Sequence, residues 1–310
     1  MDIIIESVPN ISEGRNLDLI NSIAKTIKSS KVNLLDVHYD WDHNRSVFSF
    51  IGNVNKVFNA IFNITELIYD KIDLNKHVGV HPRSGAIDVI PFIPIKNISY
   101  KELTNLVNEF GYKFFEKFNI PVYFYGFNAS KENRYKMNKI RNLGFEKLKE
   151  MLLTKNNLDI YPDIYKDKLI HERLGVSFIG VRKPLLAFNV NYKINDQNIK
   201  EKLNELAKKI RESNNGIKNV QAKVFYLQSQ NLYQLSLNIL DILNTDFYFI
   251  FETIKQYSKE LNLEIENTEI VGLIPAKTVE NILNNYLIKS NFEFKKTLFL
   301  SFNSPKGKLN

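Results

Sequence analysis

The chain has 310 residues, no cysteine, and a formal charge of +8 from 42 Lys and Arg against 34 Asp and Glu. The lack of cysteine excludes disulfides, thiolate metal ligands and thiol nucleophiles, and it suits a reducing compartment. The length exceeds one ordinary core and predicts two domains.

We expect a cytoplasmic protein with no membrane partner. Residues 1–6 carry acids where a signal peptide needs a basic start, and no apolar run approaches the ~18 residues that span a bilayer. The lysines are dispersed and do not alternate with aromatics along one stripe, so no nucleic-acid partner is expected. The positive net charge either reflects a compositional bias of the genome towards lysine, asparagine and isoleucine, or serves to attract polyanionic small molecules.

Hydrophobic periodicity in the first half of the chain predicts the element order βαββαβ. An amphipathic stretch over 100–118, a short strand over 122–125, a charged helical segment and an irregular loop near 160–174 follow it. The six predicted elements are a strand over 2–8, a helix over 17–29, strands over 32–38 and 46–52, a helix over 54–72 and a strand over 86–94.

The second half repeats the βαββαβ order without obvious residue identity. We therefore predict an α/β (α+β) protein of two ferredoxin-like units side by side, each a sheet with helices on one face. The domains should be 1–183 and 184–310, with the ligand site in the cleft between them. The repeated elements are a strand over 185–191, a helix over 196–213, strands over 220–227 and 232–240, a helix over 247–261 and a strand over 264–272.

Three polar turns, each beside an apolar strand, stand out from this pattern. The richest, residues 77–92, carries His77, His81, Arg83 and Asp88 among glycines and prolines. An ordinary strand needs only one or two turn residues before it, so a titratable imidazole, a fixed cation and a carboxylate together indicate a site. The other two turns are Pro-Asn-Ile-Ser-Glu-Gly-Arg at 9–15 and Asp-His-Asn-Arg-Ser-Val at 42–47.

These three turns resemble the glutamate formimidoyltransferase family, which also forms the transferase half of formiminotransferase-cyclodeaminase. The likeness continues in the family's order through residues 121–126, 180–191, 231–241 and 269–275. It implies two α/β subdomains with folate bound between them in a homodimer. It also implies transfer of a formimino group from N-formimino-L-glutamate to N5 of tetrahydrofolate, giving 5-formiminotetrahydrofolate and glutamate in histidine degradation.

His81 matches the histidine that the family uses as its catalytic acid/base. Imidazole suits that role because its unperturbed pKa lies near working pH, and the departing glutamate nitrogen needs a proton. The alternative is a histidine that merely caps a turn. His77 and His81 have the spacing of two metal ligands on a helix, but Gly79 and Pro82 oppose a helix there, so no metal is expected.

Substrate and folate both carry carboxylates, which an arginine fork recognises through two hydrogen bonds. Arg15, Arg45 and Arg83 are the candidates, with Arg83 the strongest, although solvated arginines are common in turns. Asn10, Asn44 and His38 could hold the amidine or pterin by hydrogen bonds, although asparagine also stabilises turns without any ligand.

The resemblance weakens at residues 162–168, where the Gly-Pro of the family's folate-lining loop is absent. Folate contacts there are carried over only to His171 and Gly175. Glu13 and Asp88 are candidate carboxylates for pairing with the cationic amidine, and Asp88 could instead serve as a buried anchor. The candidate folate-binding and substrate-binding residues are Asn10, His38, Asn44, Arg45, Arg83, Gly85, His171 and Gly175.

Two alternative functions stay open at this point. The same proton donor and carboxylate clamps could transfer a formyl group from N-formylglutamate to tetrahydrofolate. A non-catalytic folate-binding protein is the other alternative, and the altered loop after Pro162 is its only support. Retention of His81 beside Arg83 argues against it.

If His81 carries the proton, His81→Ala should fold and bind folate, because a turn histidine contributes little to core burial. Transfer should slow by roughly 10²–10⁴-fold, the usual contribution of a positioned acid or base. His77→Ala is the internal control and should lose less activity in the same assay. Near-normal turnover by His81→Ala, or a greater loss in His77→Ala, would contradict the assignment.

Overall fold

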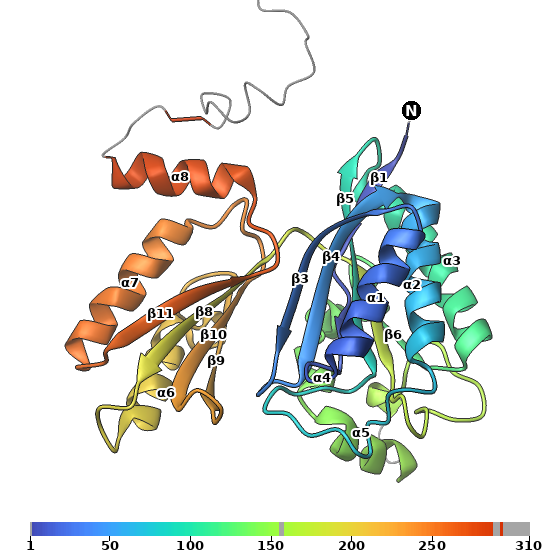
Figure 1. The fold of residues 1–310 in the computed structure, drawn as a ribbon, viewed down its shortest axis with the longest axis horizontal. Helices are drawn as coiled ribbons and strands as arrows, with labels where there is room; N and C mark the ends of the chain where they lie inside the picture. Colours follow the sequence, from blue (N-terminus) through green and yellow to red (C-terminus); the bar gives the residue numbers. More distant parts are fainter. Residues whose placement is uncertain (1, 155–157, 288–291, 294–310) are drawn as a thin grey trace, which may run out of the picture. The chain divides into compact units, whose positions relative to one another are not determined.

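The computed structural model describes residues 2–154, 158–287 and 292–293, and it divides into two compact units (Figure 1). The first unit contains Met1–Lys183 and Tyr226–Gln230. The second contains Pro184–Phe225 and the residues from Asn231 onward.

A ferredoxin-like arrangement forms the heart of the first unit. β1 lies between β4 and β5 and is antiparallel to both, while β3 pairs with the other edge of β4. The short β2 runs between the same two neighbours as β1. These elements are β1 (Ile4–Ser7), β2 (Asn10–Ile11), α1 (Leu17–Ser29), β3 (Asn33–Asp40), β4 (Arg45–Asn53), α2 (Val54–Ile68) and β5 (Ile87–Lys96).

Two parallel strands enlarge this sheet from the five strands above to the observed seven. β7 (Ser177–Val181) pairs with β5, and β6 (Val122–Gly126) pairs with β7 at the edge. Both strands are buried throughout, which is typical of parallel strands. The sequence predicted β6 but not the place of β7 beside β5.

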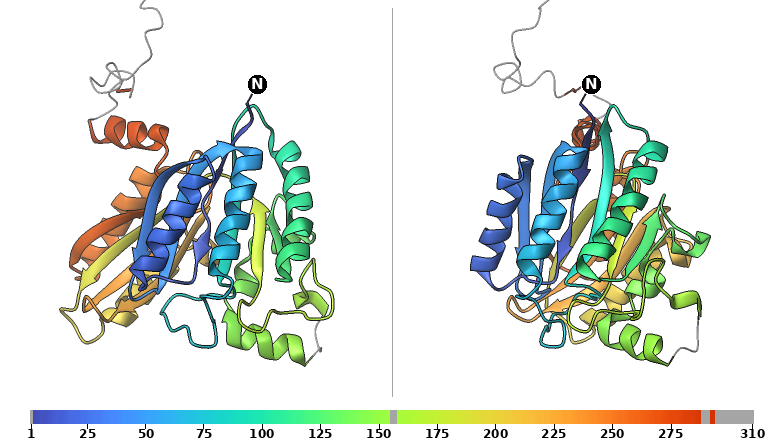
Figure 2. Two further views of the ribbon diagram at one scale, coloured as in Figure 1. Left: turned by 45° about the vertical axis from the view of Figure 1, so that its right-hand side comes forward. Right: turned by 90° about the vertical axis from the view of Figure 1, so that its right-hand side faces the viewer.

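Helices α1, α2 and α3 (Tyr100–Phe118) cover one face of the first sheet (Figure 2). Phe92 of β5 packs against Phe58 of α2 and Phe110 of α3, with ring centroids 5.1 and 5.3 Å apart. All three helices place a buried apolar stripe on this face. Burial of these stripes against the sheet explains why all three helices pack on the same face.

Local sequence sets where these helices begin. The Asn16 side chain accepts a hydrogen bond from the backbone of Leu19 and caps α1. Ser99 and Glu102 form a reciprocal capping box at the start of α3, which ends at Asn119 in the left-handed region. The expected helix over 54–72 ends at Ile68, where the backbone N–H groups of Tyr69 and Lys71 bond to the carbonyls three residues back, those of Glu66 and Ile68.

Short helices link β6 to β7. Arg134 joins the two ends of this connection, donating to the Asp163 carboxylate at 2.6 Å and to the Tyr161 carbonyl at 2.7 Å. Asp163 also accepts the Phe124 backbone N–H of β6, which anchors the connection to the sheet. The helices are η1 (Glu132–Arg134), α4 (Asn138–Arg141), α5 (Gly144–Leu153) and η2 (Leu158–Ile160).

The second unit repeats the ferredoxin-like order in a sheet of four strands, β11-β8-β10-β9. Phe188 of β8 meets Phe247 and Phe251 of α7 edge-on, with centroids 4.9 and 5.6 Å away. Its elements are β8 (Leu186–Lys193), α6 (Ile199–Ile210), η3 (Glu212–Asn214), β9 (Val220–Leu227), β10 (Leu232–Ile239), α7 (Phe247–Glu260), β11 (Ile265–Val271) and α8 (Ala276–Tyr286).

The predicted mixed α/β class with the βαββαβ order repeated is thus confirmed. The expected helix over 196–213 is shorter at both ends. The Asp196 side chain accepts a hydrogen bond from the Asn198 backbone in a turn before the helix, and the backbone of Arg211 is extended after it.

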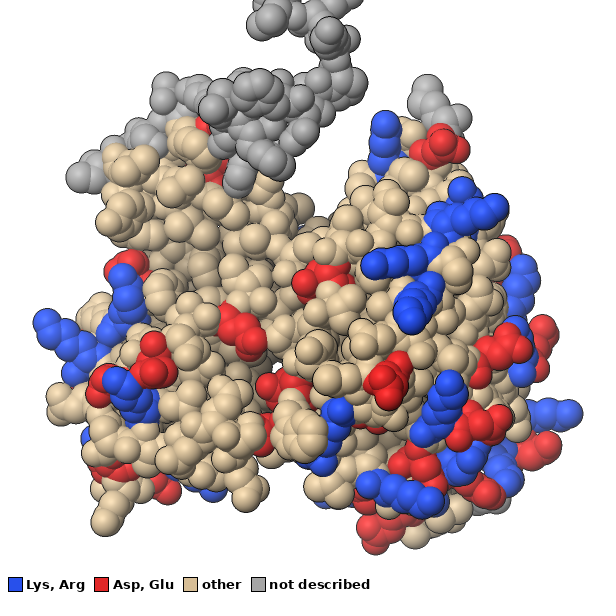
Figure 3. All heavy atoms as spheres, in the orientation of Figure 1, with Lys and Arg blue, Asp and Glu red and all other residues tan. Residues whose placement is uncertain are grey.

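Within the described residues, no helix is both long and apolar enough to cross a bilayer. On the face that Figure 3 shows, Lys and Arg are interspersed with Asp and Glu.

Candidate active site

The tip of the β3–β4 hairpin brings a carboxylate, an imidazole and a guanidinium together. Asp40 and Arg45 face each other across the hairpin as register partners. The Asp40 carboxylate accepts hydrogen bonds from the backbone N–H of His43 at 2.6 Å and from its ring Nδ1 at 2.8 Å. Burial alone would raise the pKa of Asp40, but these bonds outweigh it and hold that pKa below its ordinary value.

Asn44 joins this hairpin tip to the two other polar turns. Its side chain accepts from the Gly14 backbone at 3.0 Å and donates to the Val78 carbonyl at 3.0 Å, while the backbone is left-handed. A Cβ on Gly14 would lie 2.2 Å from the Asp40 carbonyl, and one on Gly79 would lie 2.4 Å from another carbonyl of the hairpin. Only glycine lets the turns approach this closely.

His81 lies in the third turn with both ring nitrogens engaged. Nδ1 is 2.7 Å from the Pro82 carbonyl, and Nε2 is 2.8 Å from Nη1 of Arg45. A carbonyl only accepts and a guanidinium only donates, so the proton sits on Nδ1 and the lone pair on Nε2. The ring is therefore neutral.

The surroundings of His81 oppose its protonation. Burial is the largest cause that holds its pKa well below the ordinary value, followed by the positive charges of Arg45 and Arg141. The His43 ring lies at a centroid distance of 5.8 Å from that of His81. The geometry thus presents a neutral base among cations.

Arg45 is partly buried, and its guanidinium has no salt bridge to any described carboxylate. Burial, together with Arg141, lowers the pKa of Arg45 to about 10, against the opposing attraction of Asp88 and Asp40. Arg45 is therefore charged at neutral pH. Within the described chain, its guanidinium forms a hydrogen bond with the His81 ring.

Arg83 is engaged differently, because its fork binds a protein carboxylate. Nη1 and Nη2 contact the two oxygens of Glu146 at 2.8 and 2.6 Å, and Nε donates to Nδ1 of His77 at 3.0 Å. His77 in turn donates from Nε2 to the Asn44 carbonyl at 2.7 Å. The role of Arg83 as a clamp for a ligand carboxylate stays a prediction, and these contacts favour Arg45 for it.

Asp88 anchors the turn that carries His81 and Arg83. Asp88 is 2% exposed, and one carboxylate oxygen accepts hydrogen bonds from the backbone N–H groups of Ser84 at 2.9 Å and Gly85 at 3.1 Å. The other oxygen accepts a hydrogen bond from Nε of Arg141 at 2.8 Å. Of the two roles considered for Asp88, the structure supports the buried anchor.

Gly85 and Gly175 pair in an isolated antiparallel bridge. A Cβ on Gly85 would lie 1.9 Å from the Val176 carbonyl, and Gly175 has a φ of +70°. Both positions therefore need glycine for backbone approach or conformation. His171 contacts the same segment: its Nδ1 accepts hydrogen bonds from the backbone N–H groups of Arg173 and Leu174. Its Nε2 donates a hydrogen bond to the Tyr69 hydroxyl.

The other predicted residues lie near the ends of β2, β3 and α1. Asn10 donates to the Val8 carbonyl within its own turn, and His38 is the register partner of Val47. Arg15 donates to the Trp41 carbonyl at 3.0 Å and lies 5.3 Å from the centroid of that exposed ring. Arg15 thus packs on the hairpin tip.

Sequence reasoning missed several members of this network. His43 lies inside the turn at 42–47, two residues before Arg45, and that position was an available signal. Arg141 and Glu146 belong to a charged helical segment that carries no local sign of a site. Their distance along the chain from His81 hides their role in anchoring its turn.

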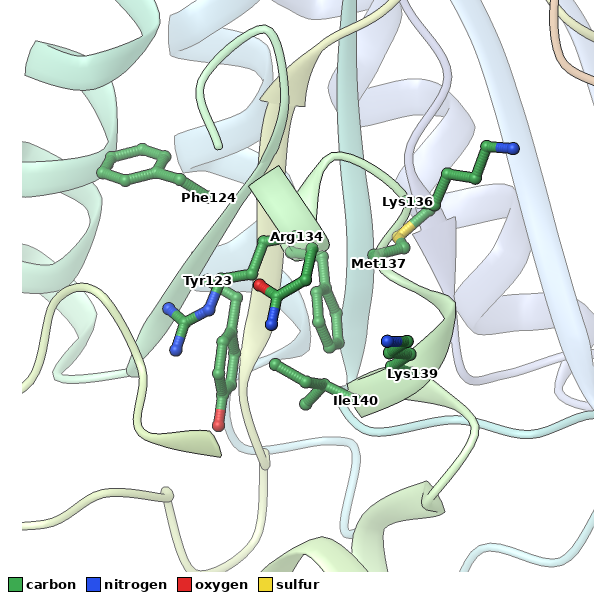
Figure 4. A pocket seen from close by; sticks show the side chains of 9 residues that line it. Tyr123, Phe124, Arg134, Lys136, Met137, Lys139 and Ile140 are labelled. Carbon is green, nitrogen blue, oxygen red and sulfur yellow. The ribbon is translucent and has the colours of Figure 1, made fainter. Parts of the chain in front are cut away.

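A separate small cavity lies between β6, β7 and the segment around α4 (Figure 4). Arg134 and Tyr123 form one wall, with the guanidinium 5.5 Å from the ring centroid. None of the predicted site residues lines it. In the described residues, no group of three or more His, Asp and Glu side chains could hold a metal ion.

If Arg83 supports the turn through Glu146, Arg83→Lys should lower the free energy of unfolding by about 1–3 kcal/mol. The reason is that the partly buried His77 ring and the carbonyls of Leu74 and His77 lose hydrogen bonds. Glu146→Gln should cost less, since Glu146 is exposed. Chemical denaturation measures both, and KM for the substrates should change little. Weaker substrate binding at unchanged stability would instead support Arg83 as a ligand clamp.

Both halves of the chain match known protein families. Residues 4–182 match the family described as the formiminotransferase domain, N-terminal subdomain, and residues 187–297 match the formiminotransferase domain. Similarity to individual proteins extends over both regions.

Two relatives are similar over nearly their full length. Glutamate formimidoyltransferase of Streptococcus pyogenes serotype M1 is 36% identical, over 95% of this chain and 97% of the relative. The protein of that name in Thermoplasma acidophilum is 33% identical, over 94% of each chain. The formimidoyltransferase-cyclodeaminase of Dictyostelium discoideum is 33% identical over 94% of this chain but 54% of its own length. The chain belongs to the formiminotransferase family.

Proposed function

We propose that the chain transfers a formimino group from N-formimino-L-glutamate to N5 of tetrahydrofolate, releasing glutamate and 5-formiminotetrahydrofolate in histidine degradation. The observation that carries this proposal is the neutral His81 imidazole, with its lone pair directed at a cation that has no protein carboxylate in salt-bridge contact among the described residues. Similarity to two glutamate formimidoyltransferases over nearly the whole chain supports it.

The reaction exchanges one carbon–nitrogen bond for another. N5 of tetrahydrofolate attacks the amidine carbon, and the bond from that carbon to the glutamate nitrogen then breaks. N5 must lose a proton, and the departing nitrogen must gain one. Nε2 of His81 takes the first and returns it to the second, so that no covalent bond to the protein is needed.

The low pKa of His81 serves both proton transfers. At neutral pH the ring is unprotonated and ready to accept, and the imidazolium formed in this buried site near Arg141 is a strong proton donor. The sequence pointed to His81 mainly as the donor to the leaving group. The tautomer adds an acceptor role that must come first.

We assign the donor carboxylate to Arg45, because a partly buried guanidinium without a salt bridge to a described carboxylate can form two charge-assisted hydrogen bonds with a ligand. Asn10, His38, Asn44, Arg83, Gly85, His171 and Gly175 remain proposed contacts for folate or substrate. The contacts of Asn44, Gly85, His171 and Gly175 support at least an indirect role, because they shape the turns around His81 and its neighbours.

Residues 1–183 and 184–310 are proposed as the two subdomains, in keeping with the separate family matches over 4–182 and 187–297. We also propose that the protein acts in the cytoplasm as a homodimer. Tetrahydrofolate is the co-substrate, and no metal, membrane or nucleic acid takes part.

The proposal predicts the sign of the pH dependence. His81 must be unprotonated to accept a proton, and its pKa is lowered, so kcat/KM should stay level through neutral pH. It should fall only as pH drops through a value well below 6.5. Initial rates across a pH series check this. An acidic limb centred at or above 6.5 would argue against His81 as the base.

Comparison of donors separates the candidate functions. With tetrahydrofolate and either formiminoglutamate, formylglutamate or formiminoglycine, we expect formiminoglutamate to have the highest kcat/KM, measured from the change in folate absorbance. A preference for formylglutamate would establish a formyltransferase. Folate binding by calorimetry without turnover of any donor would indicate a non-catalytic folate-binding protein.

A further inference from the structure

The atom that must accept the proton is covered in this structure. Nη1 of Arg45 donates to the lone pair of His81 Nε2 at 2.8 Å, and Nδ1 donates to the Pro82 carbonyl at 2.7 Å. A lone pair that already accepts a hydrogen bond from a guanidinium cannot take a proton from a substrate nitrogen. Arg45 must leave Nε2 before the base can work.

The surroundings of Arg45 indicate what could draw it away. Asp40 and Asp88 are the carboxylates that attract it, but Asp40 is occupied by His43, and Asp88 by Arg141 and the 84–85 backbone. The described part of the chain gives Arg45 no salt bridge. An incoming carboxylate would therefore meet little competition from the protein.

The strengths of the two bonds favour such an exchange. A neutral imidazole accepts one hydrogen bond from Arg45, whereas a carboxylate accepts two parallel charge-assisted bonds, each roughly twice as strong as a neutral one. Arg141, His43 and the Pro82 carbonyl also act on His81. Arg141 donates a hydrogen bond to Asp88, and His43 donates one to Asp40, so each of these two side chains has a carboxylate partner of its own.

We propose that Arg45 is a carboxylate-released cover on the catalytic base: the carboxylate of the donor draws the guanidinium off Nε2 and thereby exposes the His81 lone pair. This inference rests on the proposed function. It makes Arg45 a determinant of specificity as well as of affinity, because an amidine without a carboxylate would find the base covered.

The device can be tested by supplying the substrate in two pieces. Formamidine has the reacting amidine but no carboxylate, and propionate supplies the carboxylate separately. In the intact protein with tetrahydrofolate, propionate should accelerate formimino transfer from formamidine on the order of tenfold, a typical coupling between two ligands. Arg45→Met should transfer faster than the intact protein without propionate, and should respond to propionate less than about twofold.

Arg173→Met is the matched control. It removes an arginine that is paired with Asp70 and should keep the propionate response of the intact protein. The cover is rejected if propionate leaves formamidine transfer unchanged in the intact protein, or if Arg45→Met is slower than the intact protein under both conditions.

A second measurement does not depend on turnover or on the folding of a variant. In the intact protein labelled with ¹⁵N-histidine, L-glutamate should shift the Nε2 resonance of His81 towards that of a free lone pair. It should also raise the His81 pKa, because a cation leaves and an anion arrives. Unchanged His81 resonances at saturating L-glutamate would reject the cover, whereas this response without formiminoglutamate turnover would reject only the proposed function.

Discussion

The hydrogen bond from Arg45 to His81 organises the proposed active site. It requires a lone pair on Nε2, and the Pro82 carbonyl requires a proton on Nδ1, so the two contacts together select one neutral tautomer. Burial and the two neighbouring arginines keep that tautomer neutral. Protonation state, tautomer and the direction of the basic atom thus follow from one geometric arrangement.

That arrangement depends on three turns being held together without a regular element between them. Asn44 bonds to both other turns, Asp88 ties down the backbone before β5, and Arg83 and Arg141 extend the support to α5 and α4. Most of these contacts join a side chain to a backbone group or an oppositely charged partner. Such directional contacts fix the geometry of a turn at the end of a sheet.

The arginines of the site illustrate how the same side chain takes different roles according to its partner. Arg83 and Arg141 are neutralised by Glu146 and Asp88 and act on the backbone of the turn. Arg45 has an imidazole as its partner and keeps its charge available. A guanidinium without a protein carboxylate is costly where it is partly buried, and this cost is offset when a ligand carboxylate binds.

The sequence by itself determined the repeated βαββαβ order, because apolar periodicity and caps such as Ser99 are local properties of the chain. It also singled out the turns with His81 and Arg45, since their polar residues interrupt that periodicity. Only the tertiary structure decided that β7 extends the sheet and that Glu146 takes the fork of Arg83. Those partners are 63 or more residues apart, and a pairing between such distant groups depends on how the chain folds back, which no local pattern records.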